Sequence, residues 1–299
     1  MTTIGNARKN AIDFLKKRSA SETCILDVDV IFSCLLKKEK SFLISHRDDT
    51  LSFFNVQKLK RAIKKRAKGI PVSYITKHKE FFALDFFVNK NVLIPKPDTE
   101  LLVEVTRNFF KKNFLCENKI AILDLCTGSA CVGISLAKEI LHLFPEKKID
   151  LTLSDISRSA LLVAKKNVKR LLKNFINEKK IRVQFIPSDL FTKLNGMQFH
   201  LIVSNPPYIP TNEARKLLRD GRSEPILALD GKSNDGFAIL QKIISSAREH
   251  LLAGGALALE TGEYNAKQTQ DALYENNFEN GKLFFDLANK PRVSFGIRN

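Results

Sequence analysis

The residues with the clearest chemistry are the tetrad Asn205-Pro206-Pro207-Tyr208, which follows the apolar segment Leu201 to Ser204. Two consecutive prolines fix φ and remove two N–H donors, so this loop is stiff and rich in hydrogen-bond acceptors. The side-chain carbonyl of Asn205 and the backbone carbonyl of Pro206 can together hold both hydrogens of a planar –NH₂ group. Tyr208 can pack against the flat substrate group. We therefore predict that Asn205, Pro206 and Tyr208 are catalytic and that all four residues, including Pro207, bind the substrate.

The chemistry that suits this loop is transfer of a methyl group to a weakly nucleophilic nitrogen. The lone pair of an amide or aryl-amine nitrogen is delocalised. Two fixed acceptors orient the –NH₂ group and favour positive charge on the nitrogen as the methyl group arrives, without a strong base. The alternative is a Pro-rich turn with a buried aromatic side chain, but the position directly after a strand of an α/β sheet favours catalysis.

Three other segments could hold a nucleoside, and each lies at the end of a predicted strand. Asp124 ends an apolar strand and precedes a loop of small residues, which lets the backbone approach a ligand closely. Asp155 can accept hydrogen bonds from both ribose hydroxyls. Asp189 can accept from an adenine amino group, and Leu190 can lie against the ring.

Taken alone, each of these segments is equally consistent with a tight turn or a helix cap. Their recurrence after successive strands favours a nucleoside cofactor. The predicted cofactor-binding residues are Asp124, Cys126, Thr127, Gly128, Ser129, Ala130, Asp155, Asp189, Leu190 and Asn205.

The elements that must position these residues fall into three parts. Residues 1–75 show helical spacing of apolar side chains and no strand-like alternation, which predicts a small helical bundle. Residues 76–97 are predicted to form a β-hairpin and a Pro-bearing linker. Residues 98–299 alternate between strands and helices, which predicts an α/β domain with a mostly parallel sheet.

Two helices of the predicted bundle have distinct patterns. Residues 57–68 carry seven basic side chains around apolar residues spaced by four, which predicts a basic amphipathic helix. In the preceding helix, the predicted buried face comprises Leu26, Val30, Ile31, Cys34 and Leu35.

The composition limits the other classes of site. The five cysteines include no Cys-x-x-Cys pair and the five histidines form no cluster, so we predict neither disulfides nor a metal site. No apolar run approaches the roughly 18–20 residues of a membrane span. We expect a cytoplasmic monomer without membrane contact.

The net charge of +17 leaves two interpretations open. Lysine could fill the solvated faces of helices throughout the chain, or the positive field could favour a weak contact with RNA or the ribosome. Charge alone identifies no partner.

The tetrad and the cofactor segments resemble those of class I methyltransferases that modify planar –NH₂ groups. Over residues 5–299, the chain resembles the HemK/PrmC family of peptide chain release factor glutamine methyltransferases. The motifs that carry the narrower resemblance are Gly69-Ile-Pro71-Val-Ser-Tyr74, Glu80-Phe81-Phe82, Ile94-Pro95-Lys96-Pro97-Asp98-Thr99-Glu100, Asn205 to Pro210, Glu224-Pro225, Ala228-Leu229-Asp230-Gly231, Leu259-Glu260-Thr261-Gly262, Asp286-Leu287-Ala288 and Arg292-Val293. The tetrad itself is shared with DNA adenine methyltransferases, so the residues outside it make the match specific.

The resemblance implies a Rossmann-like sheet with an antiparallel C-terminal strand, joined by a hairpin to a helical domain that binds the release factor. It also implies methyl transfer from S-adenosylmethionine to the glutamine amide nitrogen of the Gly-Gly-Gln motif in class I release factors. Asn205 and the Pro206 carbonyl would hold that amide. The 126–130 loop would line the methionine end of the cofactor, Asp155 the ribose, and Asp189 with Leu190 the adenine.

The sequence departs from the family pattern at several positions. Cys126 and Ala130 stand where the family often has glycine, and a side chain is tolerable there if φ is negative. Lys77 and Asn289 also replace expected glycines, and Asn is a plausible substitute in a left-handed conformation. Lys96 replaces a common arginine and keeps its charge without the planar fork.

Two further functions are open from the sequence alone. The tetrad and the charge are also consistent with adenine N6 methylation of DNA or RNA. The incomplete glycine pattern and the charge are consistent with an inactive protein associated with RNA or the ribosome.

Overall fold

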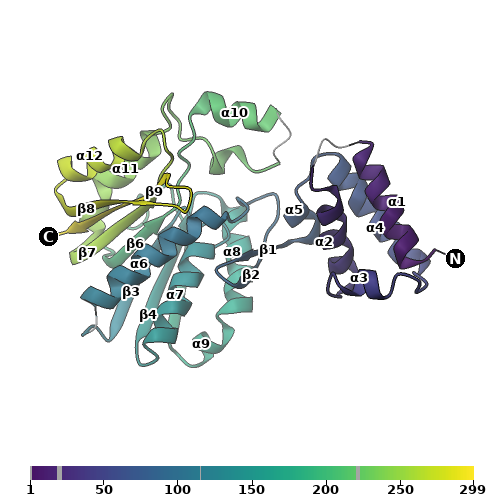
Figure 1. The fold of residues 1–299 in the computed structure, drawn as a ribbon. Helices are drawn as coiled ribbons and strands as arrows, with labels where there is room; N and C mark the ends of the chain where they lie inside the picture. The colour runs from purple at the N-terminus through teal and green to yellow at the C-terminus, as the bar shows by residue number, and fades with distance from the viewer. Residues whose placement is uncertain (1, 19–21, 115, 220–222) are drawn as a thin grey trace. The chain divides into compact units, whose positions relative to one another are not determined.

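The computed structural model describes residues 2–18, 22–114, 116–219 and 223–299. The chain forms two compact units (Figure 1). The first comprises Met1–His78 with Leu218–Ser223, and the second comprises Lys79–Leu217 with Glu224–Asn299.

The described residues of the first unit form five helices, as the helical spacing in this part of the sequence predicts. They are α1 (Ile4–Lys16), α2 (Cys24–Leu36), α3 (Phe42–Ser45), α4 (Phe53–Ala67) and α5 (Val72–Thr76). The side chains of Thr3 and Ser52 cap the first turns of α1 and α4 by accepting backbone N–H bonds. One apolar core joins α1, α2 and α4.

The buried face of α2 differs from the predicted one. Val28, Ile31 and Phe32 are buried, whereas Leu26 is 50% exposed and Cys34 is exposed. Asp27 explains part of the difference, because it is turned inward to form a 2.7 Å ion pair with Arg66 of α4. A charged residue that is buried with its partner cannot be recognised from apolar spacing.

The second unit contains a seven-stranded sheet with the order β5-β4-β3-β6-β7-β9-β8. Its strands are β3 (Lys119–Leu125), β4 (Lys148–Asp155), β5 (Ile181–Pro187), β6 (Phe199–Ser204), β7 (Leu251–Glu260), β8 (Phe278–Phe285) and β9 (Pro291–Arg298). The first five strands in this order are parallel, and β9 is antiparallel to both of its neighbours. The predicted mostly parallel sheet with an antiparallel C-terminal strand is confirmed.

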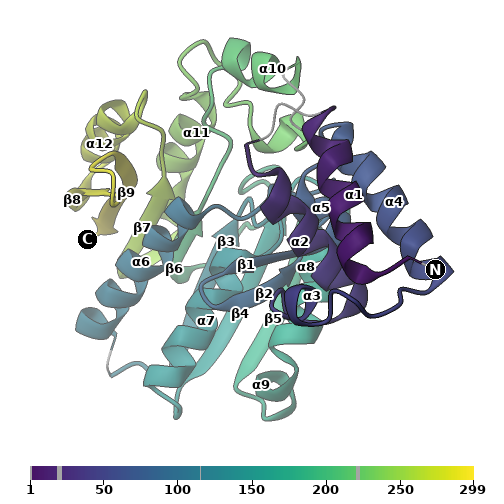
Figure 2. The ribbon, with the colours of Figure 1, turned by 45° about the vertical axis from the view of Figure 1, so that its right-hand side comes forward.

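Helices cover both faces of this sheet (Figure 2). The helices that pack on the sheet are α6 (Glu100–Asn113), α7 (Cys131–Leu143), α8 (Arg158–Leu171), α9 (Lys173–Asn177), α11 (Ala238–Ala247) and α12 (Ala266–Glu275). The chain also forms α10 (Thr211–Arg219) and the 3₁₀ turns η1 (Pro97–Thr99), η2 (Ile226–Ala228) and η3 (Arg248–His250). Neither α10 nor α12 is predicted by the sequence pattern. Among the described residues, no helix is long and apolar enough to cross a membrane.

The central strand β3 shows why both faces must be covered. Ile120 and Ile122 contribute to the core beneath α6, α7 and α8, while Leu123 and Leu125 contribute to the core beneath α11 and α12. Successive residues of a strand point to opposite faces, so a strand that is apolar on both faces needs helices on both sides. This packing holds the carboxyl ends of β3, β4 and β6 at one edge of the sheet.

The hairpin before the sheet consists of β1 (His78–Phe81) and β2 (Leu84–Phe87). Its turn residues Phe82 and Ala83 both have positive φ, of 50° and 55°. Glu100 stabilises this turn, because its Oε1 accepts the Phe82 N–H at 2.7 Å. Two of the motifs that carry the family resemblance therefore meet at this contact.

Candidate functional site

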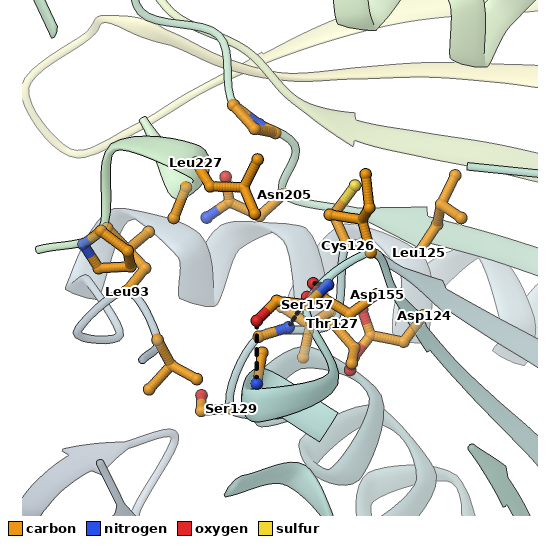
Figure 3. A pocket seen from close by; sticks show the side chains of 18 of the residues that line it. Leu93, Asp124, Leu125, Cys126, Thr127, Ser129, Asp155, Ser157, Asn205 and Leu227 are labelled. Carbon is orange, nitrogen blue, oxygen red and sulfur yellow. Dashed lines mark hydrogen bonds between the residues drawn. The ribbon is translucent and has the colours of Figure 1, made fainter. Parts of the chain in front are cut away.

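A pocket lies in the second unit at the carboxyl ends of β3, β4, β5 and β6. It contains about 1100 Å³ of space free of protein atoms, part of which is open to solvent. Figure 3 shows Asn205 and Leu227 on one side of the cavity and Thr127, Asp155 and Ser157 on the other. Ligands of open α/β sheets bind at this edge.

The loop after β3 is held by the buried carboxylate of Asp124. Its Oδ2 accepts hydrogen bonds from Thr127 Oγ1 at 2.7 Å and from the Gly133 N–H at 2.9 Å. Burial raises the pKa of Asp124 to about 7, although both hydrogen bonds oppose this shift. Asp124 borders the pocket, and it also shapes the loop that lines it.

Two residues of this loop have backbone conformations that sequence reasoning did not anticipate. Cys126 and Ala130 have φ values of 59° and 64°, so the expectation of negative φ at these positions is wrong. Both keep the left-handed conformation that glycine usually provides. Burial raises the pKa of the Cys126 thiol, which keeps the thiol neutral beside the pocket. Lys77 and Asn289 are left-handed as well, with φ values of 63° and 57°.

Asp155 at the end of β4 faces the 126–130 loop. Its Oδ2 accepts the Gly128 N–H at 2.9 Å, and its Oδ1 accepts the Ser157 N–H at 2.8 Å. A carboxylate has about four acceptor positions, so each oxygen can still accept a hydroxyl hydrogen. Asp155 therefore orders the cofactor loop and retains the capacity to bind a ribose.

The structure brings almost all of the predicted cofactor residues to one pocket. The predicted residues that border it are Asp124, Cys126, Thr127, Gly128, Ser129, Asp155, Asp189, Leu190 and Asn205. Ala130 does not line the pocket and is fully buried. Sequence reasoning missed several lining residues: Leu93, Pro95, Ile156, Ser157, Leu227 and Lys232. Ile156 could have been predicted from the sequence, because an apolar side chain directly after a strand-end carboxylate can lie against a base.

The buried Asn167 of α8 supports the same loop from behind. Its Nδ2 donates to the backbone oxygen of Ser129 and to that of Phe87, both at 2.9 Å. Its Oδ1 accepts the Phe87 N–H at 2.8 Å. One side chain thus fixes the loop after β3 against the hairpin strand β2.

The tetrad follows β6, and only part of it borders the pocket. Asn205 and Pro207 line the cavity, while Pro206 and Tyr208 do not. Asn205 Nδ2 donates to Thr99 Oγ1 at 3.1 Å. Within the described parts of the chain, neither Asn205 Oδ1 nor the Pro206 carbonyl accepts a hydrogen bond, so both acceptors are available to a ligand.

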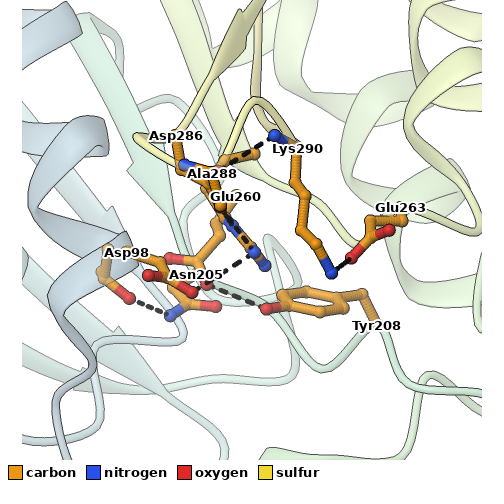
Figure 4. Close-up of polar contacts among 10 residues, drawn as sticks. Asp98, Asn205, Tyr208, Glu260, Glu263, Asp286, Ala288 and Lys290 are labelled. Atoms are coloured by element: carbon orange, nitrogen blue, oxygen red, sulfur yellow. Dashed lines mark hydrogen bonds and ion pairs between the residues drawn. The ribbon is translucent and has the colours of Figure 1, made fainter.

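Tyr208 is held in place by close packing around its ring and backbone. Its hydroxyl donates to Glu260 Oε1 at 2.9 Å (Figure 4), and its carbonyl accepts from Asn265 Nδ2 at 3.0 Å. A Cβ on Gly262 would lie 3.1 Å from the tyrosine ring, and one on Gly236 would lie 2.1 Å from the Tyr208 carbonyl oxygen. A side chain at position 236 therefore has no room beside Tyr208, and one at position 262 would displace the tyrosine ring by a few tenths of an ångström. The predicted stacking of Tyr208 on a substrate stays a prediction.

The motifs around the tetrad are linked by charged contacts. Lys96 Nζ lies 2.9 Å from Glu224 Oε1, which also accepts the Ile94 N–H at 3.2 Å. Arg292 contacts Asp286 at 2.9 Å and Asp98 at 3.2 Å. Each of these two groups of contacts thus joins residues that are far apart in the sequence.

The lining of the pocket suits a nucleoside. Asp155 and Asp189 offer acceptors for hydroxyl and amino groups, while Ile156 and Leu190 offer apolar surface for a base. The described residues contain no group of three or more His, Cys, Asp or Glu side chains that could hold a metal ion.

Comparisons with known proteins agree over nearly the whole chain. The family model described as the PrmC N-terminal domain matches residues 6–76, and the model described as the methyltransferase small domain matches residues 98–221. The release factor glutamine methyltransferase of Leptospira interrogans is 37% identical, covering 95% of this chain and 94% of its own. That of Clostridium acetobutylicum is 35% identical, covering 94% of each chain.

A solved methyltransferase structure from Pyrococcus furiosus has 16% identity and a TM-score of 0.48, covering 79% of this chain and 98% of its own. The family assignment rests on the sequence relatives, which are 35–37% identical over 88–95% of this chain. The chain belongs to the release factor glutamine methyltransferase family.

Proposed function

We propose that this protein transfers a methyl group from S-adenosylmethionine to the side-chain amide nitrogen of glutamine in the Gly-Gly-Gln motif of class I peptide chain release factors. It is a protein-glutamine methyltransferase that supports translation termination. Adenine methylation of DNA or RNA is not favoured, because relatives that align over nearly their whole length are release factor glutamine methyltransferases.

The observation that carries the proposal is the open acceptor pair at the end of β6. Asn205 Oδ1 and the Pro206 carbonyl have no hydrogen-bond donor among the described residues, and Asn205 borders the pocket. Two acceptors orient both hydrogens of an amide –NH₂ group and stabilise the positive charge that builds up on its nitrogen. A substrate amide held by these two acceptors could therefore receive the methyl group without a general base.

S-adenosylmethionine supplies an electrophilic methyl group when it is bound. We assign its ribose to Asp155, its adenine to Asp189 and Leu190, and its methionine end to the 126–130 loop with Asp124. The support for this assignment is the convergence of these residues on one pocket beside Asn205.

The remaining assignments concern the division of the chain and its surroundings. We assign residues 1–75 to release factor binding, 76–97 to the linker and 98–299 to methyl transfer. The exposed basic side chains of α4, which include Lys60, Arg61 and Lys64, would give a weak contact with RNA or the ribosome. The protein would act as a monomer in the cytoplasm, where release factors function.

Incubation of the purified protein with a release factor and S-adenosylmethionine tests the proposal. Peptide mass spectrometry should locate one added methyl group on the glutamine of the Gly-Gly-Gln motif. A release factor in which that glutamine is replaced by alanine is the matched control and should remain unmodified. Methylation of DNA or RNA with no methylation of the release factor would overturn the proposal.

A further inference from the structure

The loop that lines the cofactor pocket contains a peptide bond that is held at both ends. This peptide joins Ser129, which borders the pocket, to Ala130. Its N–H belongs to Ala130 and donates to the Thr127 carbonyl at 2.7 Å. Its carbonyl belongs to Ser129 and accepts from Asn167 Nδ2 at 2.9 Å. Because the N–H and the carbonyl of a trans peptide point in opposite directions, the two bonds together fix the plane of this peptide.

The side chain of Asn167 can hold this plane because the hairpin strand β2 fixes its orientation. A backbone N–H only donates, so the Asn167 atom that faces the Phe87 N–H at 2.8 Å must be the acceptor Oδ1. The two hydrogens on Nδ2 then reach the carbonyls of Phe87 and Ser129, both at 2.9 Å. Asn167 has no exposed surface, and a rotation of its amide would leave these buried groups unpaired.

The orientation of this peptide matters because the residue after it has an unfavourable backbone. Ala130 has a φ of 64°, which is left-handed. For a residue with a side chain, this conformation is less populated than negative φ by a factor of about 5–30, whereas glycine adopts both about equally. Turning over the peptide between Ser129 and Ala130 would change φ at Ala130 and relieve this strain. The hydrogen bond from Asn167 opposes that movement.

The start of α7 depends on the same residue. Ala130 is the N-cap of α7, and the next two residues, Cys131 and Val132, border the pocket. The first N–H groups of a helix have no partner within the helix and suit a carboxylate. In the assignment above, the carboxylate of the methionine end of S-adenosylmethionine lies at this end of the pocket. A change of φ at Ala130 would change the direction of these N–H groups relative to the 126–130 loop.

We propose that Asn167 is a positioning residue of the cofactor site, because it holds Ala130 in the left-handed conformation that receives the methionine end of S-adenosylmethionine. Asn167 thereby supplies from α8 what a glycine at position 130 would supply by itself. The inference rests on the proposed function for the assignment of the methionine end to this loop, but its test does not need methyl transfer.

Four proteins test this role: the wild type, Asn167→Asp, Ala130→Gly and the double variant that carries both changes. Asn167→Asp keeps an acceptor for the Phe87 N–H and removes the amide donors. Because apparent affinity falls with the population of the binding-competent loop, calorimetry should show about tenfold weaker binding of S-adenosylmethionine to this variant. Ala130→Gly should bind within about threefold of the wild type. The double variant should bind within about threefold of Ala130→Gly, because glycine tolerates the left-handed conformation without support.

A second variant, Asn167→Ala, removes every hydrogen bond of the side chain without introducing an acid. It should weaken binding of S-adenosylmethionine in the same way, and Ala130→Gly should again restore most of the lost affinity. Far-ultraviolet circular dichroism checks that each variant is folded.

Asn276→Asp is the matched control. Asn276 follows α12, its Nδ2 donates to the Ala272 carbonyl at 2.8 Å, and it does not border the pocket. Its affinity for S-adenosylmethionine should stay within about twofold of the wild type. A matched ligand is 5′-methylthioadenosine, which lacks the carboxylate and ammonium groups of the methionine. Its affinity for Asn167→Asp should also stay within about twofold of the wild type, because the defect lies at the other end of the cofactor.

The affinities can overturn the proposal in three ways. An equal loss from Asn167→Asp with and without Ala130→Gly would show that the loss does not depend on the backbone of Ala130. An equal loss for S-adenosylmethionine and 5′-methylthioadenosine would show that the defect is not confined to the methionine end. Unchanged affinity in both Asn167 variants would show that the loop needs no support.

The same measurements separate this proposal from the proposed function. A wild type that binds S-adenosylmethionine but leaves the release factor unmodified would refute the proposed function. The affinities of the variants would still decide the role of Asn167, because they depend only on cofactor binding.

Discussion

Replacement of Asp124 by asparagine should change the stability of the protein in a way that depends strongly on pH. Burial raises the pKa of Asp124 from 3.8 to about 7 in the folded protein. Between these values the folded state keeps a proton that the unfolded state releases, so stability falls as the pH rises from about 4 to 7. A difference of about 3 pKa units corresponds to at most about 4 kcal/mol. Asp124→Asn is neutral at every pH and escapes this loss.

The relevant quantity is therefore the difference in unfolding free energy between Asp124→Asn and the wild type. It should be smallest below about pH 3, where the wild-type aspartate is protonated in both states, and should increase by up to about 4 kcal/mol by pH 8. A constant offset is expected from the buried asparagine –NH₂ group, but it does not depend on pH. Other carboxylates titrate alike in both proteins, so their contributions cancel.

Urea unfolding followed by far-ultraviolet circular dichroism at several pH values measures this difference, and the absence of tryptophan rules out tryptophan fluorescence as the probe. Asp85→Asn is the matched control, because Asp85 is about half exposed and pairs with Arg170 at the surface. Its effect should stay below about 1 kcal/mol throughout. A difference for Asp124→Asn that stays flat, or that shrinks as the pH rises, would refute burial as the dominant influence on this carboxylate.

Other substitutions test the strained backbone and the site. Lys37→Gly and Lys77→Gly should each stabilise the protein by about 0.5–1 kcal/mol, because relief of about 1–2 kcal/mol of left-handed strain exceeds the entropy that glycine adds to the unfolded chain. Lys64→Gly is the control inside α4 and should destabilise the protein by about 1 kcal/mol. The urea unfolding midpoints of the three variants, compared with that of the wild type, measure these effects. Asp155→Asn should weaken S-adenosylmethionine binding by about 10–100-fold in calorimetry, and an unchanged affinity would contradict the ribose assignment. Asn205→Ala should lower kcat by about 100-fold or more while cofactor affinity stays within about threefold, and near-normal turnover would contradict its role.

The sheet and the ends of its strands were predictable because they depend on local patterns. Apolar runs that end in Asp124, Asp155 or Asn205 identify buried parallel strands, and the carboxyl ends of such strands meet at one edge. The tetrad could therefore be placed beside the cofactor segments without a structure. The helix α12 was missed because its apolar side chains are few, and α10 because it is mostly polar.

The contacts behind the tetrad could not be predicted, because they join residues that are far apart in the chain. Thr99 lies 106 positions before Asn205, and Tyr208 lies 52 positions before Glu260. In the sequence, Glu260 is an isolated acid at the end of an apolar strand. Only the sheet order, which places β7 beside β6, brings its carboxylate under the tyrosine. The resemblance to the family identified these motifs but assigned them no physical role.

The positions where glycine was expected show where reasoning from one residue is insufficient. Cys126 and Ala130 were expected to have negative φ, because a side chain makes a left-handed backbone unfavourable. Hydrogen bonds around the loop nevertheless impose this conformation. The Asp124 carboxylate accepts hydrogen bonds from Thr127 and Gly133, and the Asp155 carboxylate accepts one from Gly128. These bonds fix the path of the loop from both sides, so the backbone keeps the shape that a glycine would give it. The strain is then offset by contacts that the cofactor loop requires, which explains how the loop can form without two of the expected glycines.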